Sequence, residues 1–164
     1  MAYLLDADVF IRAKNLHYGF DFCPAFWDWL VVNNAAGKVF SVEKVGDDVQ
    51  ALADELSNWA GARGPGFFLR PDAAVFPALA AVSTWAQSQH YEPSAVSTFL
   101  QVADYYLVAQ AHAGKHAVVT HKIPSASKRK IQIPDACLGL AVKCVTPYEM
   151  LRRERTRFVL GAQP

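Results

Sequence analysis

The stretch Tyr3-Leu4-Leu5-Asp6-Ala7-Asp8-Val9-Phe10-Ile11 sets the expected fold, because an apolar run meets two carboxylates in it. Residues 3–5 show no alternation of apolar and polar side chains, so they predict a strand buried on both faces, as in a parallel sheet covered by helices. Ligands of such sheets bind at the carboxyl ends of the strands, where we expect Asp6. A carboxylate that emerges from a core needs a hydrogen bond or a cation. The simpler explanation is that Asp6 or Asp8 caps the following helix.

Length and composition indicate one domain spanning residues 1–164, of which 52% are hydrophobic and 19% charged. The high apolar fraction hints at a further buried surface, such as a homodimer interface or a contact with a partner protein. An acid at position 6 without a basic leader argues against a secretory signal, and no run reaches 18 apolar residues. We therefore expect a cytoplasmic protein that does not enter a membrane.

The cysteines and histidines lack the spacings of metal sites. Cys23, Cys137 and Cys144 form no CxxC pair, and the five histidines form no HExxH pattern. We expect reduced cysteines that act as small core residues, with neither a disulfide framework nor a zinc site.

Charge is distributed unevenly along the chain. Residues 1–114 hold 6 basic and 12 acidic residues, a net charge of −6, whereas residues 115–164 hold 10 and 3, a net charge of +7. An acidic site beside a basic C-terminal third suits a protein that holds a cation and contacts phosphates. A solvated basic tail is the alternative explanation.

Apolar periodicity predicts helices that alternate with short strands. The expected helices cover residues 8–16, 24–36, 41–59, 75–89, 94–113 (as one or two helices) and a last segment after Thr146; the expected extended segments are 38–40, 67–69, 117–120 and 142–145. Ser41 is the expected N-cap of the 41–59 helix. The sequence GARGPG at 61–66 indicates a turn, because it lacks the Lys-Ser/Thr of a phosphate-binding loop. This order predicts a three-layer α/β/α sandwich with a small, mainly parallel central sheet.

Three aspartates that are far apart in the sequence share apolar surroundings. Asp6 follows the first strand, Asp48 falls on or beside the apolar face of the 41–59 helix, and Asp104 is the only acid within residues 99–109. Convergence on a divalent cation would explain all three, since Mg²⁺ prefers a few carboxylates plus waters and leaves room for a phosphate oxygen. Such a cation lowers the pKa of an attacking water and stabilises charge on phosphorus. For Asp104, an exposed helix position or a hydrogen-bonded core position would also serve.

Taken in order, these segments resemble the PIN-domain family, in particular VapC-like toxins and an uncharacterised PIN-like branch. The matching segments are LLDADVFI (4–11), VGDDV (45–49), ADYYLVAQA (103–111) and VVTHK (118–122), with FCPAFWDWL (22–30) and KIQIPDACLGLAVKCVTPYEML (130–151) for the branch. The resemblance covers nearly the whole chain. It implies a PIN-like fold and a Mg²⁺- or Mn²⁺-dependent endoribonuclease that hydrolyses RNA, with the toxin of a toxin–antitoxin pair as one role and an antitoxin protein as its partner.

The resemblance also implies roles for individual residues. Asp6, Asp48 and Asp104 would hold the metal and carry catalysis, with Glu43 or Asp47 as alternatives for the second acid. The residues implied to bind the RNA backbone are Lys115, Lys122, Lys128, Arg129 and Lys130. Contacts of this kind position the RNA without conferring a choice of sequence.

The end of the VVTHK segment departs from the family pattern. Thr120 matches the family's threonine, which orients a metal-bound water or an acid, but Lys122 stands where the family usually has an acid. An ammonium in place of a carboxylate changes the local charge by two units and should lower the affinity for a divalent cation. Asp135 is a candidate replacement ligand, Lys122 is a candidate contact to the scissile phosphate, and loss of catalysis is the third possibility.

Two other functional classes remain open. The residues DADVF, VVT and the following lysine also resemble haloacid dehalogenase phosphatases, in which Asp6 would be phosphorylated and Asp8 would be the general acid. That family needs an acid pair after the lysine, and no two of the acids that follow Lys122 are adjacent. The non-enzymatic class is a PIN-fold module that binds RNA or protein, which Lys122 and the apolar composition favour.

Overall fold

Across residues 1–161, which the computed structural model describes, the central sheet has five parallel strands in the order β3-β2-β1-β4-β5. The strands are β1 (Tyr3–Leu5), β2 (Val39–Val42), β3 (Phe68–Leu69), β4 (Ala117–Val119) and β5 (Cys144–Val145). Strand β1 is central and buried at all three residues, as the sequence predicts. Tyr3 pairs with Val39 on one side and with Ala117 on the other.

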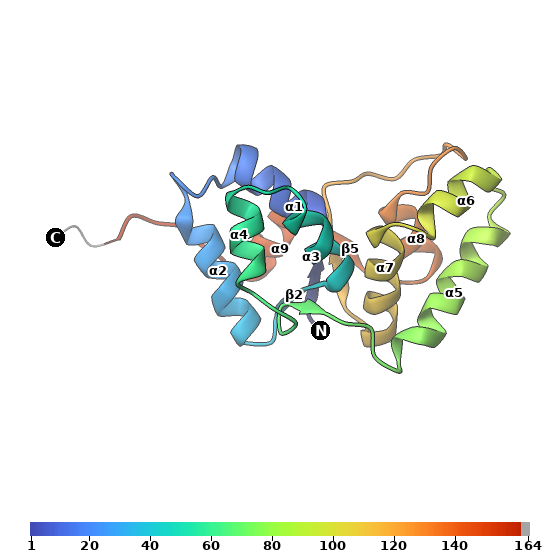
Figure 1. The fold of residues 1–164 in the computed structure, drawn as a ribbon, viewed down its shortest axis with the longest axis horizontal. Helices are drawn as coiled ribbons and strands as arrows, with labels where there is room; N and C mark the ends of the chain where they lie inside the picture. The colour runs from blue at the N-terminus through green and yellow to red at the C-terminus, as the bar shows by residue number, and fades with distance from the viewer. Residues whose placement is uncertain (162–164) are drawn as a thin grey trace.

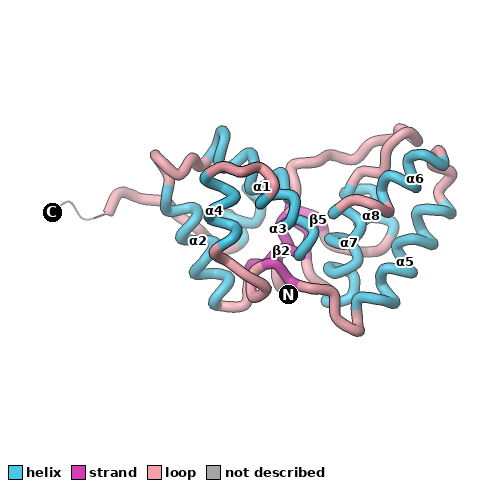
Figure 2. Tube along the Cα trace, viewed as in Figure 1, coloured by secondary structure: helices cyan, strands magenta, loops and turns pink. Residues whose placement is uncertain are grey.

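Helices cover both faces of this sheet. Figure 1 shows α5, α6, α7 and α8 on one side of the strands and α2, α4 and α9 on the other, and Figure 2 shows the strands enclosed between them. The predicted three-layer α/β/α sandwich is therefore confirmed. The helices are α1 (Ala7–Arg12), a π-helical segment (Ala13–His17), α2 (Pro24–Ala35), α3 (Glu43–Gln50), α4 (Glu55–Gly61), α5 (Val75–Ser88), α6 (Pro93–Phe99), α7 (Ala103–Gly114), α8 (Ile133–Gly139) and α9 (Pro147–Arg153).

The expectation of one helix over residues 41–59 is wrong. Ser41 lies in β2, and its hydroxyl donates a hydrogen bond to the Leu5 carbonyl at 2.6 Å instead of capping a helix. The helical region is divided into α3 and α4 by residues 51–54. Asp54 and Ser57 form a reciprocal capping box that starts α4, and Ala53 before it has a positive φ of 54°. The apolar spacing continues across both helices, so the capping residues, and not the periodicity, place the break.

Most of the other expected elements are present, and one helix was not expected. The extended segments match β2 to β5 to within a few residues, and the long region after Ser94 contains two helices, α6 and α7. The sequence does not predict helix α8, because the helix has only seven residues and Pro134 lies in its first turn. Ile133, Ala136 and Cys137 nevertheless bury one face of it.

Helix α7 links the core to the edge of the sheet where the strands end. It contacts β1, β2 and β4, and Leu107, Val108 and Ala111 on it are fully buried. Its first turn therefore lies next to the residues that follow β1 and β4. Within residues 1–161, every helix is too short or too polar to cross a membrane.

Candidate functional site

Asp6 lies directly after β1 and is 2% exposed. It caps α1, because its Oδ1 accepts a hydrogen bond from the Ala7 N–H at 2.8 Å. Its Oδ2 accepts a second hydrogen bond from the Thr120 hydroxyl at 2.8 Å. Burial and then the negative charge of Asp8 raise the pKa of Asp6 to about 6, against the opposing effect of Lys122. Asp6 is therefore both a helix cap and a member of a charged cluster.

Thr120 meets Asp6 because β1 and β4 are parallel neighbours. Leu5 pairs with Val119, so the residues that follow these two strands emerge side by side. The Thr120 hydroxyl, besides its bond to Asp6, lies 3.3 Å from Asp8 Oδ2 and accepts a hydrogen bond from the Lys122 N–H at 3.1 Å. Asp8 also accepts the His121 N–H at 3.1 Å. This network fixes the backbone after β4 and directs the Lys122 side chain.

The Lys122 ammonium bridges two of the three predicted acids. Its Nζ lies 3.0 Å from Asp104 Oδ2 and 3.3 Å from Asp6 Oδ2. Burial acts to lower the pKa of Lys122, but the charges of Asp6 and Asp104 outweigh it and hold that pKa above its ordinary value. The side chain is 26% exposed, so Lys122 is partly accessible to solvent. A permanent positive charge thus occupies the space between the two carboxylates.

Asp48 lies farther out than Asp6 and Asp104. It is an exposed residue of α3, and burial, Asp47 and Asp104 together raise its pKa. Asp104 is one of the charges that act on Asp48, so the two carboxylates lie within electrostatic reach of each other. The structure therefore brings Asp6, Asp104 and Thr120 together around Lys122 and leaves Asp48 at the solvent side of the cluster.

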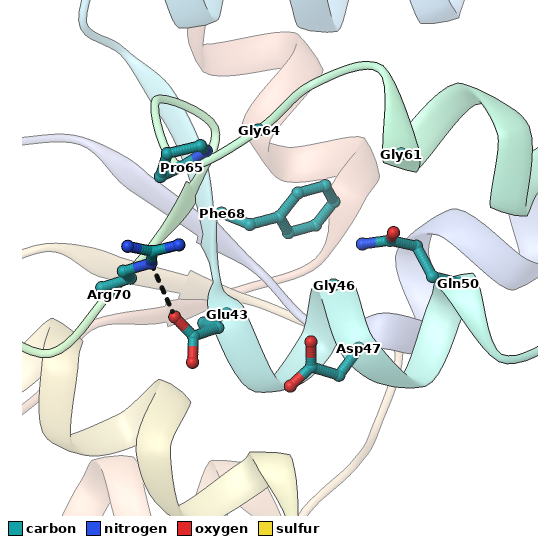
Figure 3. Close-up of a pocket in the computed structure, with 9 residues that line it drawn as sticks. All are labelled: Glu43, Gly46, Asp47, Gln50, Gly61, Gly64, Pro65, Phe68 and Arg70. Carbon is teal, nitrogen blue, oxygen red and sulfur yellow. Dashed lines mark ion pairs between the residues drawn. The ribbon is translucent and has the colours of Figure 1, made fainter.

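The other two acids of α3 line a different cavity. Glu43 pairs with Arg70, Oε2 to Nε, at 3.1 Å, and both lie with Asp47 at a cavity of about 570 Å³ between α3 and β3. Figure 3 shows this pair on one side of the cavity, with the Phe68 ring above Gly46. Glu43 and Asp47 were the alternatives for the second acid, and the structure places both at this cavity, whose lining includes neither Asp104 nor Lys122.

Asp135 does not join the Lys122 cluster in this arrangement. It lies in the first turn of α8, and its Oδ2 accepts a hydrogen bond from the Ser125 N–H at 3.0 Å. That bond holds the start of the basic loop, residues 125–130. The expected replacement of the missing acid by Asp135 is therefore not what the structure shows; its carboxylate positions the loop.

The predicted basic residues divide into three groups. Lys128 is held in place, because its Nζ donates to the Gln89 carbonyl at 3.0 Å and lies 4.6 Å from the centre of the Tyr91 ring. Arg129 and Lys130 are exposed and line a cavity with Lys122 and Asp104. Lys115 precedes β4 and lies at the amino edge of the sheet, outside the lining of that cavity, so its expected contact with RNA stays a prediction.

Sequence reasoning did not identify a cluster beside Asp8. His17 Nε2 lies 3.0 Å from the Tyr148 hydroxyl, and the rings of His17 and His121 are 5.6 Å apart between centroids. Burial lowers the pKa of His121, an effect that Asp8 opposes. Only the position of His121 directly after Thr120 could have indicated this cluster from the sequence. The contacts of His121 with His17 and Tyr148 join distant parts of the chain.

The cluster around Lys122 does not fit a divalent metal centre as it is arranged. Asp6 and Asp104 carry the hard oxygen ligands that Mg²⁺ prefers. However, their Oδ2 atoms already contact one ammonium, and among residues 1–161 no three His, Cys, Asp or Glu side chains are grouped to hold a metal ion. The charge that a cation would supply is supplied here by Lys122.

Comparison with known proteins places the chain in a family. No curated protein and no solved structure matches it. A family model described as a domain of unknown function, DUF4411, matches residues 3–158, which include every residue of the cluster around Lys122. The chain therefore belongs to the DUF4411 family.

Proposed function

We propose that this chain is a PIN-type RNA-binding protein in which Lys122 takes the place of the divalent cation that PIN-domain ribonucleases use. The observation that carries the proposal is the position of its ammonium, 3.0 Å from Asp104 and 3.3 Å from Asp6. The segments around Asp6, Asp48, Asp104 and Thr120 resemble those of PIN domains, and this resemblance supports the proposed likeness to PIN-type proteins.

The surroundings of Lys122 favour RNA over a small phosphate ester. Arg129 and Lys130 extend the positive charge of Lys122 along an exposed edge, as a polyanion requires. Such contacts bind the RNA backbone and do not read its sequence. RNA binding therefore needs no metal in this site.

The same ammonium weakens hydrolysis. A divalent ion between Asp6 and Asp104 would have to displace Lys122, and two like charges a few ångströms apart repel by about 1–4 kcal/mol, depending on solvent access. We therefore expect wild-type protein to bind RNA and to cleave it slowly or not at all in the presence of Mg²⁺ or Mn²⁺.

The second candidate is a metal-dependent endoribonuclease, with an antitoxin protein as its partner. One observation favours it: two carboxylates, Asp6 and Asp104, contact a single ammonium and Asp8 lies beside them at the Thr120 hydroxyl, so negative charge remains in excess, and the pKa of Asp6 is raised to about 6. In this case Asp6, Asp104 and Asp48 would hold the metal, which would supply Lewis-acid activation of water. Thr120 would orient Asp6.

The decisive experiment restores the acid that the family resemblance leads us to expect. We predict that Lys122→Glu binds Mn²⁺ in calorimetry and cleaves labelled single-stranded RNA at least about tenfold faster than wild type, because the change removes the ammonium and adds a carboxylate. Lys122→Met, which removes the charge without adding a ligand, is the matched control and should gain less. Adding Asp104→Asn to Lys122→Glu should abolish the gain.

The outcomes separate the two candidates. Efficient Mn²⁺-dependent cleavage by wild-type protein, lost in Asp104→Asn, would establish the nuclease and refute the proposal. Wild-type protein that binds neither Mn²⁺ nor RNA would refute both candidates.

A further inference from the structure

Lys122 and Asp104 form one side of a cavity of about 410 Å³ beside α6. The basic loop lies next to α6 (Figure 1). The Lys128 carbonyl accepts a hydrogen bond from the Glu92 N–H, directly before α6, at 2.9 Å. The Arg129 side chain lies 3.9 Å from the Glu92 carboxylate, Nε to Oε1. These contacts hold the loop against α6, so the helix forms one side of the cavity and the loop forms another.

The lining of this cavity has three chemically different parts. Phe99, Val102 and Ile131 provide an apolar wall. Ser94 and Thr98, two exposed hydroxyl-bearing residues one turn apart on α6, line the same space. The cationic rim consists of Lys122, Arg129 and Lys130.

A nucleotide has the same three parts: a flat face with little polarity, a base edge that makes hydrogen bonds, and a phosphate. Binding pockets for ligands of this size have volumes of about 300–1,000 Å³, with mostly apolar walls and a few polar groups that fix orientation. Proteins that recognise single-stranded RNA unstack its bases and hold them individually. The volume, the lining residues and the charge of the cavity therefore all favour a nucleotide as its ligand.

We propose that this cavity is a nucleotide subsite, which takes one unstacked base of single-stranded RNA and holds the adjoining phosphate at Lys122, Arg129 and Lys130. The inference rests on the proposed function and adds the form of RNA that is bound. A base in a duplex is stacked and paired, so the subsite selects single strands. The phosphate at Lys122 lies beside Asp104, which places the nucleotide next to the acidic cluster.

The cavity between α3 and β3 does not offer the same chemistry. Its charged residues are Glu43, Asp47 and Arg70, and the one cation among them is paired with Glu43 at 3.1 Å (Figure 3). Acids outnumber cations two to one in this space, whereas three cations and one acid, Asp104, line the cavity at α6. The charge pattern therefore assigns the nucleotide to the cavity at α6.

The test fills the cavity and compares RNA with and without a base. Thr98→Trp places a large ring in the cavity, whereas Ser97→Trp places the same ring on the exposed side of the same helix, outside the lining. Affinity is measured by fluorescence anisotropy for a short single-stranded oligoribonucleotide and for versions with one abasic position. Far-ultraviolet circular dichroism checks that both variants are folded.

For wild type and Ser97→Trp, we expect removal of the base at one position to weaken binding about tenfold, since a held base contributes about 1–3 kcal/mol. For Thr98→Trp, intact and abasic RNA should bind equally. Wild-type protein that tolerates every abasic position, or Thr98→Trp that still distinguishes them, overturns the subsite while RNA binding itself stands. Nucleoside monophosphates that bind wild type but not Thr98→Trp, without RNA binding, support the subsite with a free nucleotide as its source and refute the proposed function.

Discussion

Asp6 combines a structural role with an electrostatic cost. Its carboxylate caps α1 through the Ala7 N–H and accepts the Thr120 hydroxyl, and both contacts favour the folded chain. Burial nevertheless raises its pKa from 3.8 to about 6, with Asp8 adding to the shift. An acid whose pKa is higher in the folded than in the unfolded state opposes folding when it is ionised. The cluster around Lys122 is therefore held by the fold and costs stability at neutral pH.

This cost predicts how the stability of Asp6→Asn compares with that of wild type. Well below pH 3.8 the carboxyl is protonated in both states and costs nothing; the cost grows between the two pKa values and is complete well above pH 6. Two pKa units correspond to about 3 kcal/mol. Relative to Asp6→Asn, which keeps a capping oxygen, wild type should lose about 3 kcal/mol between pH 3 and pH 7 in urea unfolding. Stability curves that run parallel over this range would contradict the assignment.

Single residues differ in how far sequence reasoning places them. Asp6, Thr120 and Lys122 follow buried strands, so the parallel-sheet rule brought them to one edge. Asp104 was identified as a lone acid among apolar residues. The positions of Asp135 and Lys115 relative to Lys122 could not be predicted, because they depend on a loop hydrogen bond and on which end of β4 a residue adjoins, and neither has a signature in the sequence pattern.

At the level of elements, apolar periodicity located nearly every strand and helix but missed breaks that depend on local chemistry. The boundary between α3 and α4 depends on the capping box of Asp54 and Ser57, and α8 is too short to show periodicity. The resulting position of α3 matters for the site, because α3 carries Asp48 toward Asp104. Helix α3 packs against α1, α4 and α7 and against β3.

Gly46 makes the contact between α3 and β3 close, which predicts the effect of adding a methyl group. A Cβ at Gly46 would lie 2.9 Å from Cγ of Phe68, near the base of that side chain, so the ring or the helix must shift. Overpacking costs about 1–3 kcal/mol. That exceeds the gain of about 1 kcal/mol in helix propensity when alanine replaces glycine. Gly46→Ala should therefore be destabilised by about 1 kcal/mol in urea unfolding.

Gly61 provides the matched control on α4. A Cβ there meets only Gln50 Oε1 at 3.6 Å, an ordinary contact. Gly61→Ala should therefore be neutral or slightly stabilised, since the propensity gain is not opposed. If Gly46→Ala is at least as stable as wild type, Phe68 does not set the distance between α3 and β3.

At the scale of the whole molecule, the basic C-terminal third is not one surface. Seven of its ten cations form two groups: the loop at residues 128–130 lies against α6, whereas Arg152, Arg153, Arg155 and Arg157 belong to α9 and the segment after it. Figure 1 shows α6 and α9 on opposite sides of the sheet. The excess of +7 in the sequence therefore does not by itself define an RNA-binding face; the fold selects which cations stand next to Lys122.

The salt dependence of RNA binding tests this selection. Each phosphate that a single strand exchanges from counterions to protein contributes about 0.7 to the slope of log affinity against log salt concentration. Lys130 is exposed at the rim of the α6 cavity, so Lys130→Gln should lower the magnitude of that slope by about 0.7. Arg157 is equally charged and exposed but lies after α9, and Arg157→Gln should leave the slope unchanged. An equal reduction in both variants would mean that total charge, and not the arrangement around Lys122, governs binding.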